Sequence, residues 1–160
     1  MIDLAKEPVS SVMRSEFASL REDDRLDLAD QVMRLGRVRH LPVLAPDGHV
    51  AGIVSNRDLL EASLTSVLNF DATARRSFLR SIDVAEVMVR DVETVTPETS
   101  LAAAARRLIE RKIGCLPVVD ASACLVGIIT EEDFLRWATE QMLEPHSMDV
   151  LAPQPAAALA

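Results

Sequence analysis

The chain alternates between short apolar runs and longer stretches in which apolar residues recur every three or four positions. Two stretches, 25–36 and 100–113, show the second pattern, which is typical of amphipathic helices. Thr99 or Ser100 can cap the later helix, because hydroxyl side chains accept hydrogen bonds from the first free N–H groups of a helix. The shorter apolar or alternating runs predict strands at 17–21, 40–45, 50–55, 92–97, 115–120 and 125–130.

The segments that join these elements also carry signals. The turn "APDGHV", 45–50, contains Asp-Gly, so the strands on either side of it are expected to pair antiparallel. Short helical turns are predicted at 8–13 and 83–88, and a helix is predicted to follow each hairpin. Asp71 can cap a connecting helix within 68–82. This helix is expected to bury three apolar side chains, Phe78, Leu79 and Ile82.

The second part of the chain repeats the first. When Val9 is set against Val84, the alignment continues without a gap to Leu64 against Thr139. Identical residues stand at Val9/Val84, Val12/Val87, Met13/Met88, Leu26/Leu101, Ala29/Ala104, Leu41/Leu116, Pro42/Pro117, Val43/Val118, Gly52/Gly127, Ile53/Ile128, Asp58/Asp133 and Leu60/Leu135. Each unit is predicted to run strand, helix, strand, strand, helix. The junction "GIVSNRDLL" in the first unit corresponds to "GIITEEDFL" in the second.

Length and charge narrow the function classes. A chain of 160 residues suits one compact domain or two half-size units that share a core. The net charge of −8 argues against a nucleic-acid partner, because phosphate binding needs Lys and Arg. The longest apolar runs fall short of the roughly 18 residues of a membrane span, and the start lacks signal-peptide features. We therefore expect a cytoplasmic protein without a membrane partner.

Cysteines and acidic pairs give little support for catalysis. Cys115 and Cys124 are too few for a disulfide framework and are interpreted as small buried hydrophobes, and no Cys/His cluster predicts zinc. No Ser, Cys or Thr has a His neighbour in a motif that would activate a nucleophile. The acidic pairs at 23–24 and 131–132 lie at predicted helix starts, where they complement the helix dipole. We expect no enzymatic activity, no catalytic residue and no catalytic cofactor.

The order "VM…LPV…GI(V/I)(S/T)xxD", present twice within 9–140, resembles a tandem pair of CBS domains, the arrangement called a Bateman module. The resemblance implies an α/β (α+β) fold in which two pseudo-symmetric CBS motifs pack together and leave two clefts. Similar proteins commonly bind adenosine-containing ligands such as AMP, ADP, ATP or S-adenosylmethionine. The implied divisions are motif 1 with an N-terminal segment at 1–64, a connecting helix at 65–83, motif 2 at 84–142, and a tail at 143–160 that is expected to be disordered.

The repeated junction supplies the candidate binding groups. Ser55 and Thr130 end the last strand of each motif, where a hydroxyl and free helix N–H groups favour phosphate or ribose oxygens. Asp58 and Asp133 follow inside the next helix, and in similar proteins this carboxylate accepts both ribose hydroxyls, which requires an ionised acceptor. The alternative is that each Asp only complements its helix N-terminus.

Differences between the motifs predict two different clefts. Similar proteins place basic side chains against a nucleotide phosphate, and the residues around Asp58 include Arg39, His40, Asn56 and Arg57. The same places in motif 2 hold Gly114, Cys115, Glu131 and Glu132. We therefore expect a basic cleft that takes a phosphorylated ligand, and an acidic second cleft that is empty or holds a neutral or cationic ligand. A solvated basic edge is the alternative interpretation of "RLGRVRH".

The base of the ligand is expected to contact aliphatic side chains from both motifs. By resemblance, adenine in the Asp58 cleft should rest near Ile53 and near the other motif's Ile113, Gly114 and Cys115. Val38 and Ile128 should serve the second cleft, alongside Thr130, Glu132 and Asp133. Core packing is the alternative for each of these aliphatic side chains.

Three hypotheses for function remain at this point. The first is a stand-alone sensor that binds an adenine nucleotide (AMP, ADP or ATP) as a regulatory ligand and passes its occupancy to an unknown regulated protein. The others are a ligand-independent dimerisation scaffold and a module for S-adenosylmethionine or a metal ion. A homodimer through helices of both motifs is expected because their apolar stripes are wide. The stripe residues are Leu101, Ala104, Ala105, Leu108, Ile109, Phe134, Leu135, Ala138 and Met142.

Overall fold

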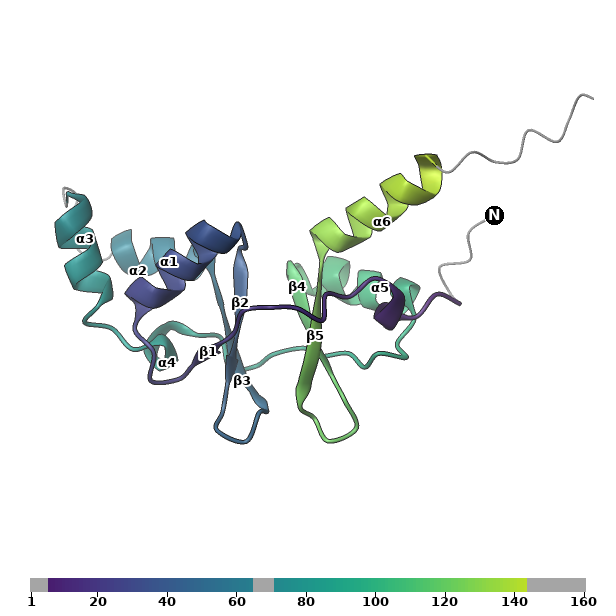
Figure 1. Ribbon diagram of the computed structural model, residues 1–160, viewed down its shortest axis with the longest axis horizontal. Helices are drawn as coiled ribbons and strands as arrows, with labels where there is room; N and C mark the ends of the chain where they lie inside the picture. The colour runs from purple at the N-terminus through teal and green to yellow at the C-terminus, as the bar shows by residue number, and fades with distance from the viewer. Residues whose placement is uncertain (1–5, 65–70, 144–160) are drawn as a thin grey trace, which may run out of the picture.

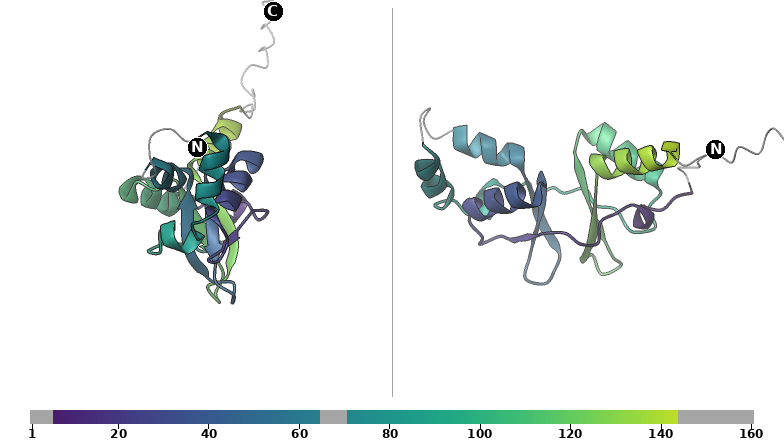
Figure 2. Two further views of the ribbon diagram at one scale, coloured as in Figure 1. Left: turned by 90° about the vertical axis from the view of Figure 1, so that its left-hand side faces the viewer. Right: turned by 45° about the horizontal axis from the view of Figure 1, so that its top comes forward.

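The computed structural model of the protein describes residues 6–64 and 71–143. The chain forms two halves side by side, with their strands at the centre and the longer helices on the outer sides (Figures 1 and 2). The first half contains β1 (Leu20–Arg21), α1 (Leu26–Gly36), β2 (His40–Leu44), β3 (Val50–Ser55) and α2 (Asn56–Leu64), followed by α3 (Ala72–Leu79). The second half contains α5 (Leu101–Arg111), β4 (Cys115–Val119), β5 (Leu125–Thr130) and α6 (Glu131–Leu143).

Antiparallel hairpins form the centre of both halves, and the first confirms the pairing predicted from the Asp-Gly turn. The order of the first sheet is β1-β2-β3, with β1 parallel to β2, and the second sheet consists of β4 and β5. His40 pairs with Ser55 in the first hairpin, and Cys115 pairs with Thr130 in the second. Each hairpin therefore places the start of one strand beside the strand-to-helix junction. This register brings the candidate residues of that junction together.

The prediction of a strand at 92–97 is wrong, because this described segment forms only an isolated bridge. Val95 makes a single parallel bridge to Val118, with its N–H 3.0 Å from the carbonyl oxygen of Pro117. The chain then turns, because the Thr99 N–H donates to the Thr96 carbonyl oxygen at 3.0 Å. Pro97 in this turn has no N–H to offer to a sheet.

Helix caps follow the sequence signals where a suitable side chain is present. Ser100, rather than Thr99, caps α5 by accepting a hydrogen bond from the Ala103 N–H at 3.2 Å. Asp71 caps α3 by accepting from the Ala74 N–H at 2.8 Å, which confirms the connecting helix. Among its predicted buried side chains, Leu79 is buried and the other two, Phe78 and Ile82, are half-buried.

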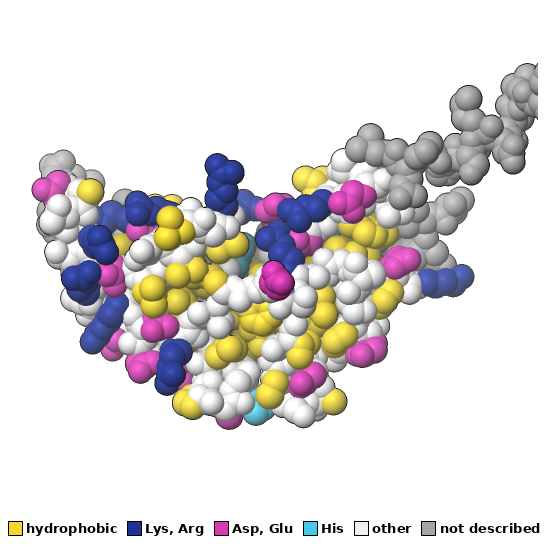
Figure 3. Space-filling view, viewed as in Figure 1, with side chains coloured by type: hydrophobic (Ala, Val, Ile, Leu, Met, Phe, Trp, Pro, Cys, Tyr) yellow, Lys and Arg dark blue, Asp and Glu magenta, His cyan; other side chains and the backbone are white. Residues whose placement is uncertain are grey.

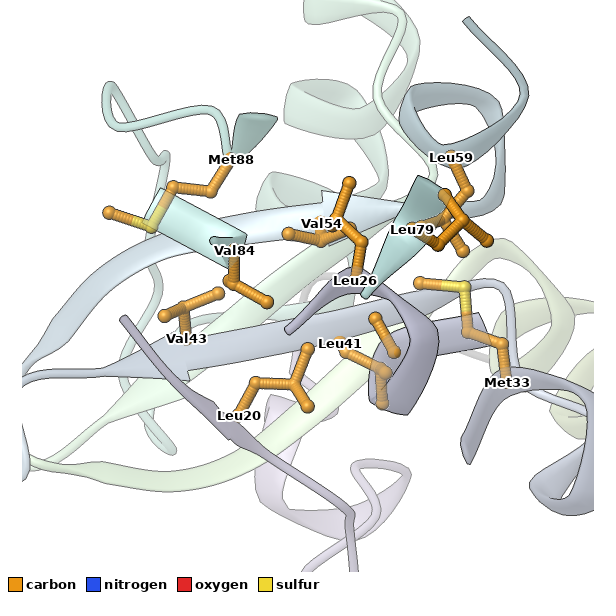
Figure 4. Close-up of a cluster of buried hydrophobic side chains, with 11 residues drawn as sticks. Leu20, Leu26, Met33, Leu41, Val43, Val54, Leu59, Leu79, Val84 and Met88 are labelled. Carbon is orange, nitrogen blue, oxygen red and sulfur yellow. The ribbon is translucent and has the colours of Figure 1, made fainter. Parts of the chain in front are cut away.

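Each half has its own hydrophobic core, and each core takes a helical turn from the other repeat. The predicted turns are η1 (Val9–Ser11) and α4 (Val84–Val87). Val84 packs into the first core among Leu26, Leu41 and Val54 (Figure 4). Val9 packs into the second core beside α5, and the N-terminal segment then crosses to β1 (Figure 1). The opening turns of the two repeats are therefore exchanged.

Backbone hydrogen bonds hold the crossing segments on the hairpins. Val89 and Ile53 exchange two bonds of 2.9 Å across the first hairpin edge. Arg14 and Ile128 exchange bonds of 2.9 and 3.0 Å at the matching place in the second half. These contacts carry the segment after α4 over the first hairpin, where it forms one wall of a cleft.

Part of the apolar stripe on α5 that was expected to form a dimer interface is buried within the chain itself. Leu101, Ala104 and Leu108 are buried in the second core, so these side chains are not available to a partner. Ile109 on α5, and Leu135 and Met142 on α6, remain exposed. In the part of the chain that is described, no helix combines the length and apolar character needed to cross a membrane.

Candidate functional site

An open cleft of about 610 Å³ lies between the two halves at Asp58. One side is formed by the end of β3 and the start of α2, and the other by the turn before β4 together with residues 89–93. All ten residues predicted for this cleft line it: Arg39, His40, Ile53, Ser55, Asn56, Arg57, Asp58, Ile113, Gly114 and Cys115. The volume falls in the range typical of small-molecule sites.

Asp58 uses one carboxylate oxygen to hold the start of α2. Its Oδ2 accepts hydrogen bonds from the Ser55 N–H at 2.6 Å and the Ser55 hydroxyl at 2.7 Å, and the Asp58 N–H lies 3.3 Å from Ser55 Oγ. This reciprocal pattern is a capping box with Asp in place of Glu. Within the described residues, the other oxygen, Oδ1, has no hydrogen-bond partner. It is therefore available to a ligand.

Asp133 accepts the same two hydrogen bonds in the second half, but its other oxygen is occupied. Its Oδ2 accepts from the Thr130 N–H at 2.8 Å and from the Thr130 hydroxyl at 2.7 Å. Oδ1 accepts from Arg14 Nε at 2.6 Å, and the carboxylate side chain is only 2% exposed. A second guanidinium nitrogen of Arg14 lies 3.8 Å from Glu132. Arg14 thus fills the place beside Asp133 that is open beside Asp58.

Beside this ion pair, the second cleft is reduced to a cavity of about 30 Å³. The structure places four of its predicted residues in the lining, namely Val38, Ile128, Thr130 and Glu132. Asp133 is absent from the lining because Arg14 and Thr130 cover its carboxylate. Such a cavity holds about one water molecule rather than a nucleoside.

The predicted contrast between a basic and an acidic cleft is wrong. Glu131 lines the Asp58 cleft, where Asp91 and Glu93 add two further carboxylates, while Arg14 and Arg37 line the smaller cavity. The starts of β2 and β4 meet between the halves, so side chains of one repeat reach the cleft of the other. On the face seen in Figure 3, basic and acidic side chains are accordingly intermingled rather than divided between the halves.

His40 and Cys115 contribute neutral groups to the open cleft. Burial, followed by the positive charge of Arg39, lowers the pKa of His40, although the carboxylates of Glu131 and Asp58 act in the opposite direction. His40 is therefore neutral at pH 7. Burial raises the pKa of the Cys115 thiol to about 12, with a smaller contribution from Asp133. Cys115 is buried, as predicted, and remains a protonated thiol.

Sequence reasoning missed the cleft wall formed by Val89, Asp91, Val92 and Glu93, together with Leu60 and Lys112. This wall depends on the exchanged crossing segments, which periodicity does not reveal. The repeated Gly52 and Gly127 were a usable signal, since a glycine inside a strand often marks a close approach of another backbone. Among the described residues, no group of three or more His, Cys, Asp or Glu is arranged to hold a metal ion.

The fold is a paired-repeat module, in which an open cleft between tandem α/β repeats is lined by apolar and polar groups from both halves. The family model of the CBS domain matches residues 9–65 and 84–140, and the chain belongs to this family. The predicted tandem CBS module and its mixed α and β fold are thereby confirmed.

Solved structures of similar proteins share this fold over most of their length. A Vibrio cholerae protein described as AcuB, an acetoin utilization protein, is 34% identical with a TM-score of 0.72, covering 84% of this chain and 92% of that one. CBSX2, crystallised in complex with AMP, is 28% identical with a TM-score of 0.71, covering 84% and 97%. The CBS domain pair of MJ0100, crystallised with 5′-methylthioadenosine and S-adenosylmethionine, is 21% identical with a TM-score of 0.70, covering 82% and 98%, and shows the fold alone.

Similar sequences occur within larger proteins. The homoserine O-acetyltransferase of Methanococcoides burtonii is 34% identical over 128 residues, which is 80% of this chain and 23% of that enzyme. This chain spans about a quarter of the length of the first acetyltransferases it matches. A CBS domain-containing protein of Dictyostelium discoideum is 28% identical over 127 residues, which is 79% of this chain and 88% of that protein.

Proposed function

We propose that the protein is a regulatory module that binds an adenosyl ligand in the Asp58 cleft and passes its occupancy to a partner protein. The observation that carries the proposal is the open cleft of about 610 Å³ at the unengaged Oδ1 of Asp58. CBSX2, a relative of the same family, was crystallised with AMP, which supports an adenosine-containing ligand. A ligand in this cleft would contact both halves and so link them.

Each part of an adenosyl ligand has a chemical match in the lining. Asp58 Oδ1 is an ionised acceptor for ribose hydroxyls, and Ser55 holds it in place through Oδ2. Ile53 and Ile113 supply apolar surface for the base from opposite halves. Arg57 is exposed at the start of α2, where a basic side chain and the helix N-terminus both favour a phosphate.

S-adenosylmethionine is the second candidate ligand, and the charge of the lining favours it. Four carboxylates line the cleft, from Asp58, Asp91, Glu93 and Glu131, against three basic side chains, from Arg39, Arg57 and Lys112, so acidic groups are in slight excess. This arrangement suits the sulfonium and ammonium groups of S-adenosylmethionine and disfavours the triphosphate of ATP. Among nucleotides we therefore expect AMP to bind better than ATP, because it places less negative charge near the carboxylates.

Titration calorimetry of the full chain with AMP, ADP, ATP, adenosine and S-adenosylmethionine tests the proposal. Asp58→Asn keeps the size of the side chain and removes the charged acceptor, so we expect binding to weaken tenfold to a hundredfold, or about 1–3 kcal/mol. Asp71→Ala is the matched control, because it removes a helix-capping carboxylate far from the cleft and should leave affinity unchanged.

Two results would contradict the proposal. If none of these ligands binds, the dimerisation scaffold becomes the better interpretation of the module. If a ligand binds but Asp58→Asn has the same affinity as the unmodified chain, the ligand lies elsewhere. Replacing Arg57 by Glu separates the ligand parts, since AMP should bind more weakly while adenosine is unaffected.

A further inference from the structure

Arg14 and Val89 occupy equivalent positions in the two repeats but differ completely in side chain. Each follows an exchanged helical turn and pairs through its backbone with a hairpin, Arg14 with Ile128 and Val89 with Ile53. The four backbone hydrogen bonds are 2.9 to 3.0 Å long. Because the backbones match, the two clefts differ at this position only in the side chain.

The two side chains leave their neighbouring Asp in different states. Arg14 donates from Nε to Oδ1 of Asp133 at 2.6 Å, and burial of this carboxylate is nearly complete. Val89 is 51% exposed and has no group that can donate to Asp58. Asp58 consequently keeps a free acceptor beside a wide cleft, whereas Asp133 has none.

The guanidinium also occupies space. The cavity that Arg14 lines measures about 30 Å³, against about 610 Å³ for the cleft that Val89 lines. A nucleoside-sized ligand requires a volume of a few hundred Å³. A ligand that entered beside Asp133 would have to displace Arg14 from a buried partner, which leaves both charges to be compensated.

We propose that Arg14 is a built-in occupant of the second cleft, which takes the ligand's place on Asp133 and restricts the module to a single adenosyl site. This proposal rests on the proposed function, because the excluded ligand is of the class that the Asp58 cleft binds. The number of sites is thus set by one side chain. Arginine closes a cleft at this position, and valine leaves it open.

Counting binding sites by titration calorimetry of the full chain with AMP and with S-adenosylmethionine tests this assignment. We expect one site in the unmodified chain and two in Arg14→Val, which gives repeat 1 the residue of repeat 2. Arg80→Val is the control, since it removes an arginine that pairs with Asp27 at 3.1 Å outside both clefts, and it should retain one site. One site in both the unmodified chain and Arg14→Val, or two in the unmodified chain, would overturn the proposal.

The reverse change covers the possibility that Arg14→Val does not fold once Asp133 loses its partner. Val89→Arg alters an exposed side chain and offers a guanidinium to the free Oδ1 of Asp58. We expect ligand affinity to fall at least tenfold. Ala103→Arg, which adds the same side chain at an exposed position of α5 outside the cleft lining, should bind within about twofold of the unmodified chain. If Val89→Arg binds the ligand with unchanged affinity, the proposal that arginine at this position closes a cleft is contradicted.

The combined results separate this proposal from the proposed function. If the unmodified chain and Arg14→Val each bind ligand at one site, Arg14 is not what closes the second cleft. The proposed Asp58 site is then still supported. If the unmodified chain binds no ligand but Arg14→Val binds one, the proposed Asp58 site is contradicted. The role of Arg14 in closing the second cleft is then supported. If neither chain binds either ligand, both proposals fail.

Discussion

At the scale of single residues, Asp58 and Asp133 show that capping and ligand binding are compatible roles for one carboxylate. In both residues Oδ2 accepts hydrogen bonds from the N–H and hydroxyl of the Ser or Thr three positions earlier. Among residues 6–64 and 71–143, the remaining oxygen has no partner in Asp58 and is bound by Arg14 in Asp133. The two interpretations of a repeated Asp at a helix start, a cap or a ligand contact, are therefore not alternatives, because the carboxylate has an oxygen for each.

His49 is expected to make stability depend on pH. It lies at the tip of the first hairpin, where Nδ1 is 2.9 Å from an Asp47 carboxylate oxygen and Nε2 is 2.9 Å from the Ser122 carbonyl oxygen of the second half. The hydrogen bond and charge of Asp47 raise the pKa of His49 above 6.5. The interaction of protonated His49 with Asp47 therefore stabilises the fold fully below pH 6.5, and this stabilisation is lost as the pH rises through the raised pKa of His49.

At low pH the limit is set by Asp47, because the hydrogen bonds that it accepts from His49 lower the pKa of its carboxyl group. The stabilisation by ionised Asp47 is therefore lost as the pH falls below 3.8. Melting temperatures of the unmodified chain and His49→Gln should differ more at pH 6 than at pH 8. Titration of the histidine ring protons by NMR gives a direct check. A His49 pKa below that of His40 would contradict the expected order, because burial lowers the pKa of His40.

At the scale of elements, the two halves depend on close packing of the crossing segments over the hairpins. A Cβ at Gly52 would lie 2.7 Å from Met88 Sδ and 2.8 Å from the Val89 carbonyl oxygen. A Cβ at Gly127 would lie 2.8 Å from Met13 Sδ and 3.0 Å from the Arg14 carbonyl oxygen. The identical glycines in the two repeats are explained by this approach of backbone to backbone.

Replacing Gly52 by Ala is therefore expected to lower the free energy of unfolding by about 1–3 kcal/mol, because the added methyl group forces the crossing segment to move. Since this segment lines the cleft, ligand affinity should fall as well. Urea denaturation and calorimetry measure the two effects. Gly36→Ala is the matched control, because a Cβ there has its nearest neighbour at 3.7 Å and lies within α1, where Ala is favourable. Equal stability of Gly52→Ala and Gly36→Ala would show that the approach is looser than described.

At the scale of the whole molecule, each half completes its core with a helical turn from the other repeat, and the hairpin tips also meet. His49 contacts Ser122, and Gly48 accepts a hydrogen bond from the Leu125 N–H at 3.3 Å. The halves are consequently tied at the crossing segments and at the tips, with the open cleft at Asp58 between them. The proposed ligand in that cleft would contact both halves and so add a further tie between them.

Apolar side chains on the outer helices are exposed to solvent, and they predict a homodimer. Ile109, Leu135 and Met142 are 75%, 69% and 83% exposed on α5 and α6, and Leu35 is 77% exposed on α1. Exposed apolar groups on helices of both halves favour burial against a second copy. Light scattering coupled to size-exclusion chromatography should give a mass of about twice 17.5 kDa at micromolar concentration.

Combining Ile109→Glu with Leu135→Glu should convert the protein to a monomer without unfolding it, because both side chains are exposed. Ala103→Glu places the same charge at another exposed position of α5 and serves as the control. A monomeric mass for the unmodified chain would exclude the predicted dimer. Circular dichroism of the variants shows whether their secondary structure is retained.

Sequence patterns alone predict the repeat, most of the helices and strands, and most of the residues that line the open cleft. Local signals were enough for these, because helix periodicity, the Asp-Gly turn and the caps at Asp71 and Ser100 act over a few residues. The gap-free alignment then placed the two strand-to-helix junctions in equivalent positions. The same local reasoning overestimated the strand at 92–97, where chain direction is governed by the turn at Thr96.

The difference between the two clefts depends on contacts between residues far apart in the chain. Charges that are neighbours in sequence are divided between the clefts, so that Glu131 faces the Asp58 cleft and Glu132 approaches Arg14. Arg14 and Asp133 are 119 positions apart, and their contact exists because the opening turns are exchanged between the halves. Ion pairing depends on separation in space, which repeat alignment does not supply, whereas capping depends on separation along the chain, which the sequence contains.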